Sequence, residues 1–103
     1  MKKSDLKAKG GFVDPKPVKK RVKCRLNGED LEFDVWVVRQ PFGVVEAAMS
    51  DAHDRRHAAQ MISLCVRLGE KGEESLTYEE AFNLDVSVAW AFVQAINEAH
   101  SKN

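Results

Sequence analysis

The sequence lacks a long hydrophobic run. Its longest apolar stretch, Val86–Ile96, is interrupted by Ser87 and Gln94, and a helix that crosses a bilayer needs roughly 20 apolar residues. The lysines near the N-terminus are followed by no apolar segment, so we expect no secretory signal and no membrane association. The expected compartment is therefore a cytoplasm, where disulfides are rare.

Cysteine is also scarce, and Cys24 and Cys65 have no CxxC spacing. We interpret both as small buried apolar residues. Motifs for phosphate binding, dinucleotide binding, serine hydrolysis, zinc proteolysis and calcium binding are missing from the sequence. Gly69–Gly72 has the GxxG spacing of a loop that clamps nucleic acid. Because Glu73 and Glu74 follow it and would repel phosphate, we interpret it as a simple turn.

One histidine pair has a spacing that metal sites use. His53 and His57 lie four residues apart, on one face of a helix, with Asp54 beside them. A closed zinc site takes four ligands, and the sequence offers no third and fourth, so we interpret the pair as part of a solvated polar band. Because no nucleophile has an obvious base either, we expect no metal, no cofactor and no enzymatic activity.

The net charge of the whole chain is zero, but two parts of the chain carry opposite charges. The 16 bases and 16 acids of the chain cancel, yet residues 1–23 hold nine bases and two acids, a net charge of +7. Residues 24–103 hold seven bases and fourteen acids, a net charge of −7. The chain therefore consists of a basic N-terminal segment and an acidic body.

The first 17 residues, which we call the arm, have the composition of a tail. They are rich in lysine, contain Gly10-Gly11 and two prolines, and offer few side chains to bury, so a stable element is not expected. We predict a flexible basic tail over residues 1–17 and a single domain over residues 18–103. Lysine clusters bind phosphate, which makes a small nucleic-acid-associated regulatory protein the alternative function. A solvated tail is preferred, because Phe12 is the only aromatic residue of the arm and the acidic body opposes docking.

A β-hairpin is predicted after the arm. Apolar and charged residues alternate from Val18 to Val37, and Asn27-Gly28 in the middle is the strongest short signal for a hairpin. A two-residue turn there places Cys24 opposite Leu31. The same register pairs opposite charges on the other face: Arg25 with Asp30, Lys23 with Glu32, and Arg21 with Asp34. A four-residue loop also keeps the apolar faces together, so the register stays open between these two.

Helical spacing follows the hairpin. Pro41-Phe42-Gly43 breaks the strand, and segment 44–68 contains neither proline nor glycine. Its apolar stripes predict either one bent helix or two helices broken near Asp54. Gly69 stands where a C-cap glycine belongs.

Two capping signals mark the C-terminal third of the chain. Thr77 and Glu80 have the capping-box spacing, which predicts a short helix through Phe82. Asp85 is placed to cap a last helix over residues 86 to about 100. The expected fold class is therefore α+β, an N-terminal β-hairpin followed by three to four helices.

The last helix and the helix over residues 56–68 are apolar around most of their circumference, whereas a surface helix needs an apolar stripe of only ~100°. Both are either sandwiched in the core or covered by a partner. We favour self-association or partner binding, because so small a domain leaves much of its surface exposed. Trp36 and Val38 fall on the polar face of the hairpin, so we expect cover on both faces there, by a helix of the same chain or by another protein.

Five apolar residues are our candidates for partner contact: Trp36, Val38, Phe42, Trp90 and Phe92. Tryptophan and other aromatic residues often dominate the binding energy of interfaces. Of the two tryptophans, Trp90 fits a core position better than a surface position, since it lies on the most apolar helix. Trp36 fits either place equally well.

The C-terminal half resembles a known family. Its marks are Leu64–Arg67, the acidic loop Gly69–Glu74, the run Leu76–Leu84, and an apolar helix that ends in Ala95–Ala99. In this order they resemble the tail assembly chaperones of long-tailed phages. The hairpin that ends in Val37–Arg39 fits the same order. The resemblance covers about residues 18–100, without the arm.

The resemblance implies a protein that works in the cytoplasm of the infected host and is absent from the mature virion. Such chaperones bind the hydrophobic tape measure protein, keep it in solution and help to recruit tail tube subunits. They often self-associate and use no ATP. The implied partners are therefore the tape measure protein, the tail tube protein and further copies of the chain, and we expect neither a membrane nor nucleic acid among them.

Overall fold

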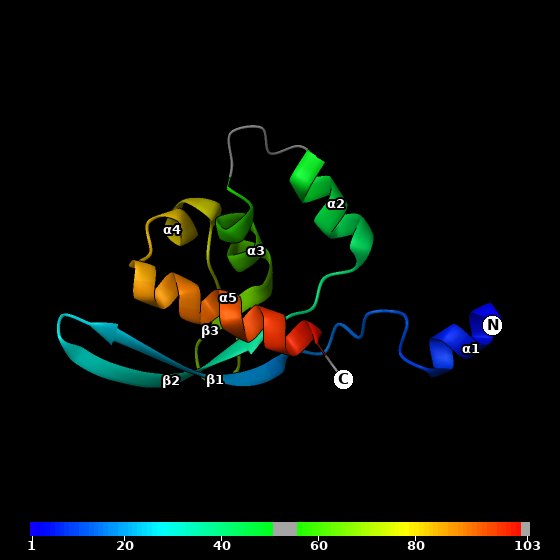
Figure 1. The fold of residues 1–103 in the computed structure, drawn as a ribbon, viewed down its shortest axis with the longest axis horizontal. Helices are drawn as coiled ribbons and strands as arrows, with labels where there is room; N and C mark the ends of the chain where they lie inside the picture. The colour runs from blue at the N-terminus through cyan, green and yellow to red at the C-terminus, as the bar shows by residue number, and fades with distance from the viewer. Residues whose placement is uncertain (51–55, 102–103) are drawn as a thin grey trace.

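The computed structural model describes residues 1–50 and 56–101, of which residues 49 and 50 by their backbone only. The elements in chain order are α1 (Lys3–Ala8), β1 (Val18–Leu26), β2 (Glu29–Val37), α2 (Phe42–Ser50), α3 (His57–Cys65), β3 (Val66–Leu68), β4 (Glu74–Ser75), α4 (Tyr78–Phe82) and α5 (Val86–His100). The strands form one antiparallel sheet in the order β1-β2-β3-β4. Helices α2 to α5 lie on one side of this sheet (Figure 1). The predicted α+β class is confirmed.

The hairpin of β1 and β2 has the two-residue turn. Asn27 and Gly28 have φ angles of 52° and 80°, the positive values that a tight hairpin turn demands of both central residues. Cys24 lies opposite Leu31, and the nine residues of β1 pair in this register with β2. The first of the two predicted registers is therefore correct.

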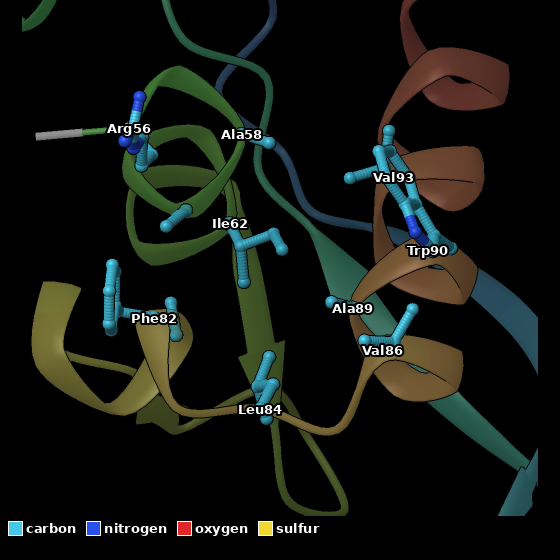
Figure 2. A pocket seen from close by; sticks show the side chains of 11 residues that line it. Arg56, Ala58, Ile62, Phe82, Leu84, Val86, Ala89, Trp90 and Val93 are labelled. Atoms are coloured by element: carbon cyan, nitrogen blue, oxygen red, sulfur yellow. The ribbon is translucent and has the colours of Figure 1, made fainter.

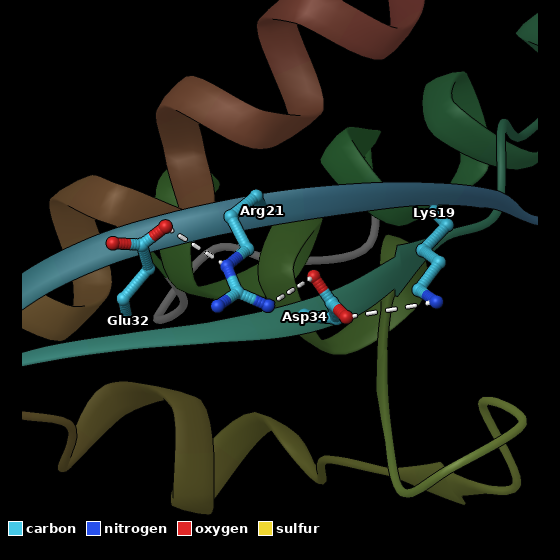
Figure 3. Close-up of polar contacts among 4 residues, drawn as sticks. All are labelled: Lys19, Arg21, Glu32 and Asp34. Carbon is cyan, nitrogen blue, oxygen red and sulfur yellow. Dashed lines mark hydrogen bonds and ion pairs between the residues drawn. The ribbon is translucent and has the colours of Figure 1, made fainter.

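Ion pairs cross the solvent face of the hairpin (Figure 3). Arg21 lies between two acids, with its Nε 3.0 Å from Glu32 Oε1 and its Nη1 3.2 Å from Asp34 Oδ1. The other oxygen of Asp34 is 3.6 Å from Lys19 Nζ. Each exposed pair contributes only ~0.2–1 kcal/mol, but together they neutralise part of the basic N-terminal segment within the hairpin.

The opposite face of the hairpin packs against α5 to form the core. Phe33 of β2 meets Phe92 of α5 edge to face, with ring centroids 6.2 Å apart, a favourable geometry for aromatic pairs. The backbone N–H of Arg25 donates to Ser87 Oγ at 2.9 Å, which ties the start of α5 to the end of β1. The buried apolar residues are Val22, Cys24, Val35, Val37, Ala59, Ile62, Cys65, Val66, Ala81, Val88, Phe92, Ala95, Ile96 and Ala99. Both cysteines are thus buried free thiols, as predicted.

The end of the predicted 44–68 helix is wrong. Helix α3 stops at Cys65, and Val66–Leu68 forms strand β3, which pairs with β2 through Val37 and Val66. Val66 is fully buried there, so the sheet offers this apolar run a better place than another helical turn. Gly69, with a φ of 93°, starts the turn from β3 into β4 and is not a helix cap.

Segment 44–68 is interrupted rather than continuous. Arg56 has an extended backbone, with φ −84° and ψ 135°, and stands as the N-cap of α3. The two-helix alternative is therefore correct, although Asp54, the predicted position of the break, lies outside the described residues. Helix α2 begins at Phe42, because the carbonyl of Pro41 accepts the first turn's N–H groups from Val44 and Val45.

The arm contains a helix that the sequence analysis did not expect. At its start the carboxylate of Asp5 accepts the backbone N–H of Lys2 at 2.9 Å. At its end the N–H groups of Gly10 and Gly11 donate back to carbonyls of α1, the bond pattern of a Schellman cap. The expectation of no stable element in residues 1–17 is therefore wrong, because the two glycines end a helix instead of loosening the chain. All 17 residues are nevertheless exposed, and α1 lies apart from the sheet (Figure 1).

Candidate partner-binding groove

An apolar groove of about 270 Å³ opens between α3, α4 and α5 (Figure 2). We call it the α3–α4–α5 groove. Its described lining consists of Arg56, Ala58, Ala59, Ile62, Ala81, Phe82, Leu84, Val86, Ala89, Trp90 and Val93. Among these residues only Arg56 is charged. The groove therefore offers a partner apolar contact and little else.

Helix α5 reaches the groove because it carries two apolar faces. One face is buried in the core and includes Phe92, which is 2% exposed. The other face lines the groove with residues at spacings i, i+3, i+4 and i+7: Val86, Ala89, Trp90 and Val93. This spacing marks one side of a helix. The unusual apolar circumference seen in the sequence is thus divided between the core and the groove.

Hydrogen-bonded caps hold the two C-terminal walls in place. Thr77 Oγ1 accepts the backbone N–H of Glu80 at 3.1 Å, and Glu80 Oε1 accepts that of Thr77 at 2.9 Å, so the predicted capping box is confirmed. Asp85 Oδ2 accepts the N–H of Ser87 at 3.0 Å and caps α5 as predicted. These caps satisfy backbone donors that a helix start leaves free, and they fix where α4 and α5 begin.

A tyrosine joins the α3 and α4 walls. Tyr78 Oη accepts the backbone N–H of Arg56 at 2.9 Å, at the N-cap of α3. On α4 the ring of Tyr78 lies 6.0 Å from that of Phe82, centroid to centroid. Phe82 is itself exposed at the rim. The position of this aromatic rim is therefore coupled to the start of α3.

The surroundings of the groove are acidic. Three acids lie on or next to the α4 and α5 walls, against one base, Arg56, in the described lining. Glu79 and Glu80 lie on α4, and Asp85 directly precedes Val86 of the groove wall; all three are exposed. An apolar channel with an acidic border favours apolar partners that carry positive charge.

The five residues predicted for partner contact fall in different places. Trp90 is 62% exposed on the groove and Phe42 is 77% exposed on α2. Trp36 and Val38 are half-buried at the end of β2. Phe92 lies in the core. The structure therefore places only Trp90 of this set on the groove.

The expectation that Trp90 is a core residue is wrong. Phe92, two positions later on the same helix, occupies the core instead. Residues i and i+2 of an α-helix point about 200° apart, so the two side chains face nearly opposite directions. Sequence reasoning also missed Phe82 and Val86, which are exposed at the rim. The signal for Val86 was its spacing of four from Trp90, which places both on one helix face.

The cover over Trp36 comes from a loop of the same chain. A Cβ atom added at Gly72 would lie 2.7 Å from Trp36 Cγ, so the Gly69–Ser75 segment approaches the ring closely. Lys19 Nζ lies 5.8 Å from the ring centroid on the same hairpin, within the range of a cation–π contact. The structure thus provides cover on the second face by a loop of the same chain, where a helix or another protein was predicted.

Two observations on the described residues bear on metal binding and on thiol reactivity. These residues contain no group of three or more His, Cys, Asp or Glu side chains that could hold a metal. His53 lies outside the described residues, so the predicted polar band is not seen, while His57 is exposed at the start of α3. The buried thiol of Cys65 has its pKa raised to about 11 by loss of solvation, which opposes its use as a nucleophile.

The GxxG segment is a turn, as interpreted. Gly69 and Gly72 have φ angles of 93° and 75°. The carboxylate of Glu73 accepts the backbone N–H of Lys71 at 2.9 Å, and this bond lowers the pKa of Glu73. A negative charge thus occupies the place where phosphate would bind.

A search for membrane-spanning helices and three comparisons with known proteins bear on the identity of the chain. No helix in the described part of the chain is long and apolar enough to cross a membrane. Searches of curated proteins and of solved structures found no significant match. A family model described as "Phage tail assembly chaperone, TAC" matches residues 4–100, which includes most of the arm and so extends further than the predicted resemblance. The chain belongs to the phage tail assembly chaperone family.

Proposed function

We propose that the chain binds the hydrophobic tape measure protein through the α3–α4–α5 groove, keeps it in solution and helps to recruit tail tube subunits. It does this without catalysis or a cofactor, in the host cytoplasm, and it leaves before the virion is complete. Family membership supports a role in tail assembly. The observation that carries the specific proposal is an apolar groove with exposed Phe82, Val86 and Trp90 at its rim.

The groove suits a helical partner. Two of its walls are helix faces set by caps, and its lining is apolar apart from Arg56 among the described residues. An amphipathic helix inserts side chains at i, i+3, i+4 and i+7 into grooves of this kind. Burying one large apolar side chain contributes about 1.5–3 kcal/mol, so two or three such contacts hold an aggregation-prone helix reversibly.

The proposal is tested with Trp90→Ser. Trp90 is mostly exposed, so we expect the variant to fold and to unfold at nearly the same urea midpoint, while binding at the groove is lost. The measurement is the fraction of tape measure protein that stays in the supernatant when it is co-expressed with each chaperone variant. We expect the wild-type chain to keep most of it in solution and Trp90→Ser to keep at most a few per cent.

The matched control is Phe42→Ser, which removes an even more exposed aromatic residue from α2, outside the groove. We expect it to behave like the wild-type chain. If Phe42→Ser loses the tape measure protein and Trp90→Ser does not, the binding surface lies on α2 and the groove is excluded. If the wild-type chain leaves the tape measure protein insoluble, the function itself is wrong.

A further inference from the structure

The arm exposes apolar side chains that its own chain does not cover. All residues from Met1 to Pro17 are exposed, and the large apolar ones among them include Leu6 at 42% and Phe12 at 55%. The order within the arm is local: α1 is closed by its own caps, and the described hydrogen bonds of residues 2–16 stay within the arm. Leu6 and Phe12 are therefore available for contact with a partner.

Charge complements the groove. The arm carries five bases and two acids, a net charge of +3, whereas Glu79, Glu80 and Asp85 at the α4 and α5 walls outnumber Arg56, the one base of the described groove lining. Lys7 directly follows Leu6 in α1 and Lys9 is the C-cap residue, so an arm that inserts Leu6 or Phe12 brings positive charge to the acidic border. Opposite potentials of this kind speed encounter and orient the partners.

The arm does not lead to the groove of its own chain. Arg25, at the end of β1, bonds to Ser87 at the start of α5. Arg21 and Lys23 share a groove with Gln94 and Glu98 further along α5. Val18, where the arm joins the sheet, therefore lies toward the C-terminal end of α5, and the α3–α4–α5 groove lies at its other end.

The connector also directs the arm outward. Pro15 and Pro17 fix their own φ angles and favour extended backbone at the residues before them. In Figure 1 the arm leaves the end of the sheet and carries α1 away from α3, α4 and α5. A second molecule is consequently better placed than the same molecule to receive it.

We propose that the arm of one copy docks in the α3–α4–α5 groove of a second copy, with Leu6 and Phe12 against Trp90 and with Lys7 and Lys9 toward Glu79 and Asp85. Two copies that exchange arms reciprocally close a dimer. The groove proposed to bind the tape measure protein is then covered by an arm until that partner displaces it. Only this last step rests on the proposed function.

The test measures the mass of the full-length chain in solution by light scattering, with no tape measure protein present. At ~0.1 M salt, where charges interact over ~10 Å, we expect at least twice the chain mass of 11.6 kDa. Leu6→Ser/Phe12→Ser removes the arm contacts and Trp90→Ser removes the groove contact without changing charge, so each should give the monomer mass. Phe42→Ser is the matched control and should associate like the wild-type chain.

Mixing the variants separates an arm–groove contact from other interfaces. The arm variant keeps an intact groove and the groove variant keeps an intact arm, so their equimolar mixture should regain a 1:1 complex. Lys7→Glu/Lys9→Glu should weaken association of the otherwise unchanged chain at least tenfold. A wild-type monomer, a mixture that stays monomeric, or an equal loss in Phe42→Ser would each overturn the proposal. None of these results bears on the binding of the tape measure protein, which is measured in the separate co-expression test.

Discussion

Trp90 and Phe92 show how two similar residues on one helix acquire opposite environments. Both are large and aromatic, and both sit in the run 86–100, which is apolar on nearly all sides. Phe92 contacts Phe33 of the sheet, while Trp90 borders the groove. Because the pattern has no polar side of useful width, the helix could be rotated either way on the sequence alone. The packing of α5 on β1 settles the rotation.

The buried thiol of Cys65 gives a pH dependence. Burial raises its pKa to about 11, whereas an unfolded cysteine has a pKa of about 8.5. The thiol's contribution to stability is therefore fully present below pH ~8.5 and is lost as the pH rises toward ~11, because the unfolded chain then releases a proton that the folded chain keeps.

Urea unfolding of the wild-type chain and of Cys65→Ala tests this between pH ~8 and ~10.5. The alanine variant will be less stable at every pH, since it leaves a cavity. The informative quantity is the slope, and we expect stability to fall more steeply with pH in the wild-type chain than in Cys65→Ala. Equal slopes would show that the buried thiol does not titrate as stated.

At the scale of elements, the hairpin turn is decided by two residues. Gly28 has a φ of 80°, a value that costs a residue with a Cβ about 1–2 kcal/mol. We therefore expect Gly28→Ala to lower the free energy of unfolding by about that amount. Urea denaturation followed by circular dichroism measures it.

The matched control is Gly43→Ala. Gly43 lies in α2, and a Cβ atom added there meets nothing within 4 Å. Alanine is preferred over glycine within a helix by roughly 0.5–1 kcal/mol, so the same chemical change should be neutral or stabilising here. A loss of stability at Gly43 as large as that at Gly28 would contradict the backbone argument.

Strand β3 shows an element that local sequence preference does not specify. Residues 66–68 continue the apolar helical pattern of α3, yet they pair with β2, and the N–H of Val38 donates to the carbonyl of Cys65 at 2.7 Å. The free edge of β2 exposes unpaired backbone N–H and C=O groups. Strand β3, some 30 residues away in the sequence, pairs with this edge, and no local signal predicts the pairing.

At the scale of the whole molecule, the zero net charge has three parts. Ion pairs cancel charge within the hairpin, the arm has a positive net charge, and the helical body has a negative one. Arg21 and Lys19 are already paired with Glu32 and Asp34. What remains is a basic arm and an acidic helical body. This distribution favours contact between copies over contact with phosphate, because the body repels a polyanion.

We therefore expect little affinity for nucleic acid. In fluorescence anisotropy with a labelled 20-base-pair duplex at ~0.15 M salt, the wild-type chain should give a Kd weaker than the ~10⁻⁴–10⁻⁶ M of non-specific DNA-binding proteins. A tighter Kd that weakens steeply with salt and is abolished by Lys7→Glu/Lys9→Glu would instead support the alternative function of a nucleic-acid-associated regulator.

The sequence by itself determined the hairpin, the position of its turn and the caps of α4 and α5, while the structure decided between the two hairpin registers. Each of these depends on atoms a few residues apart: Asn27-Gly28 at the turn, Thr77 with Glu80, and Asp85 with Ser87. Short-range hydrogen bonds and φ preferences act before any tertiary contact forms, so they can be predicted from the residues alone. The family's motifs are likewise short runs of residues, so their order could be recognised in the sequence.

Only the tertiary structure decided where the apolar surplus goes. It turned the end of the 44–68 segment into β3, chose Phe92 over Trp90 for the core, and formed a groove from three helices that no single motif encodes. These outcomes depend on which faces meet across long stretches of chain, and hydrophobic burial is non-directional. An apolar residue in the sequence therefore predicts burial, while the fold determines whether the residue is buried in the core or against another molecule.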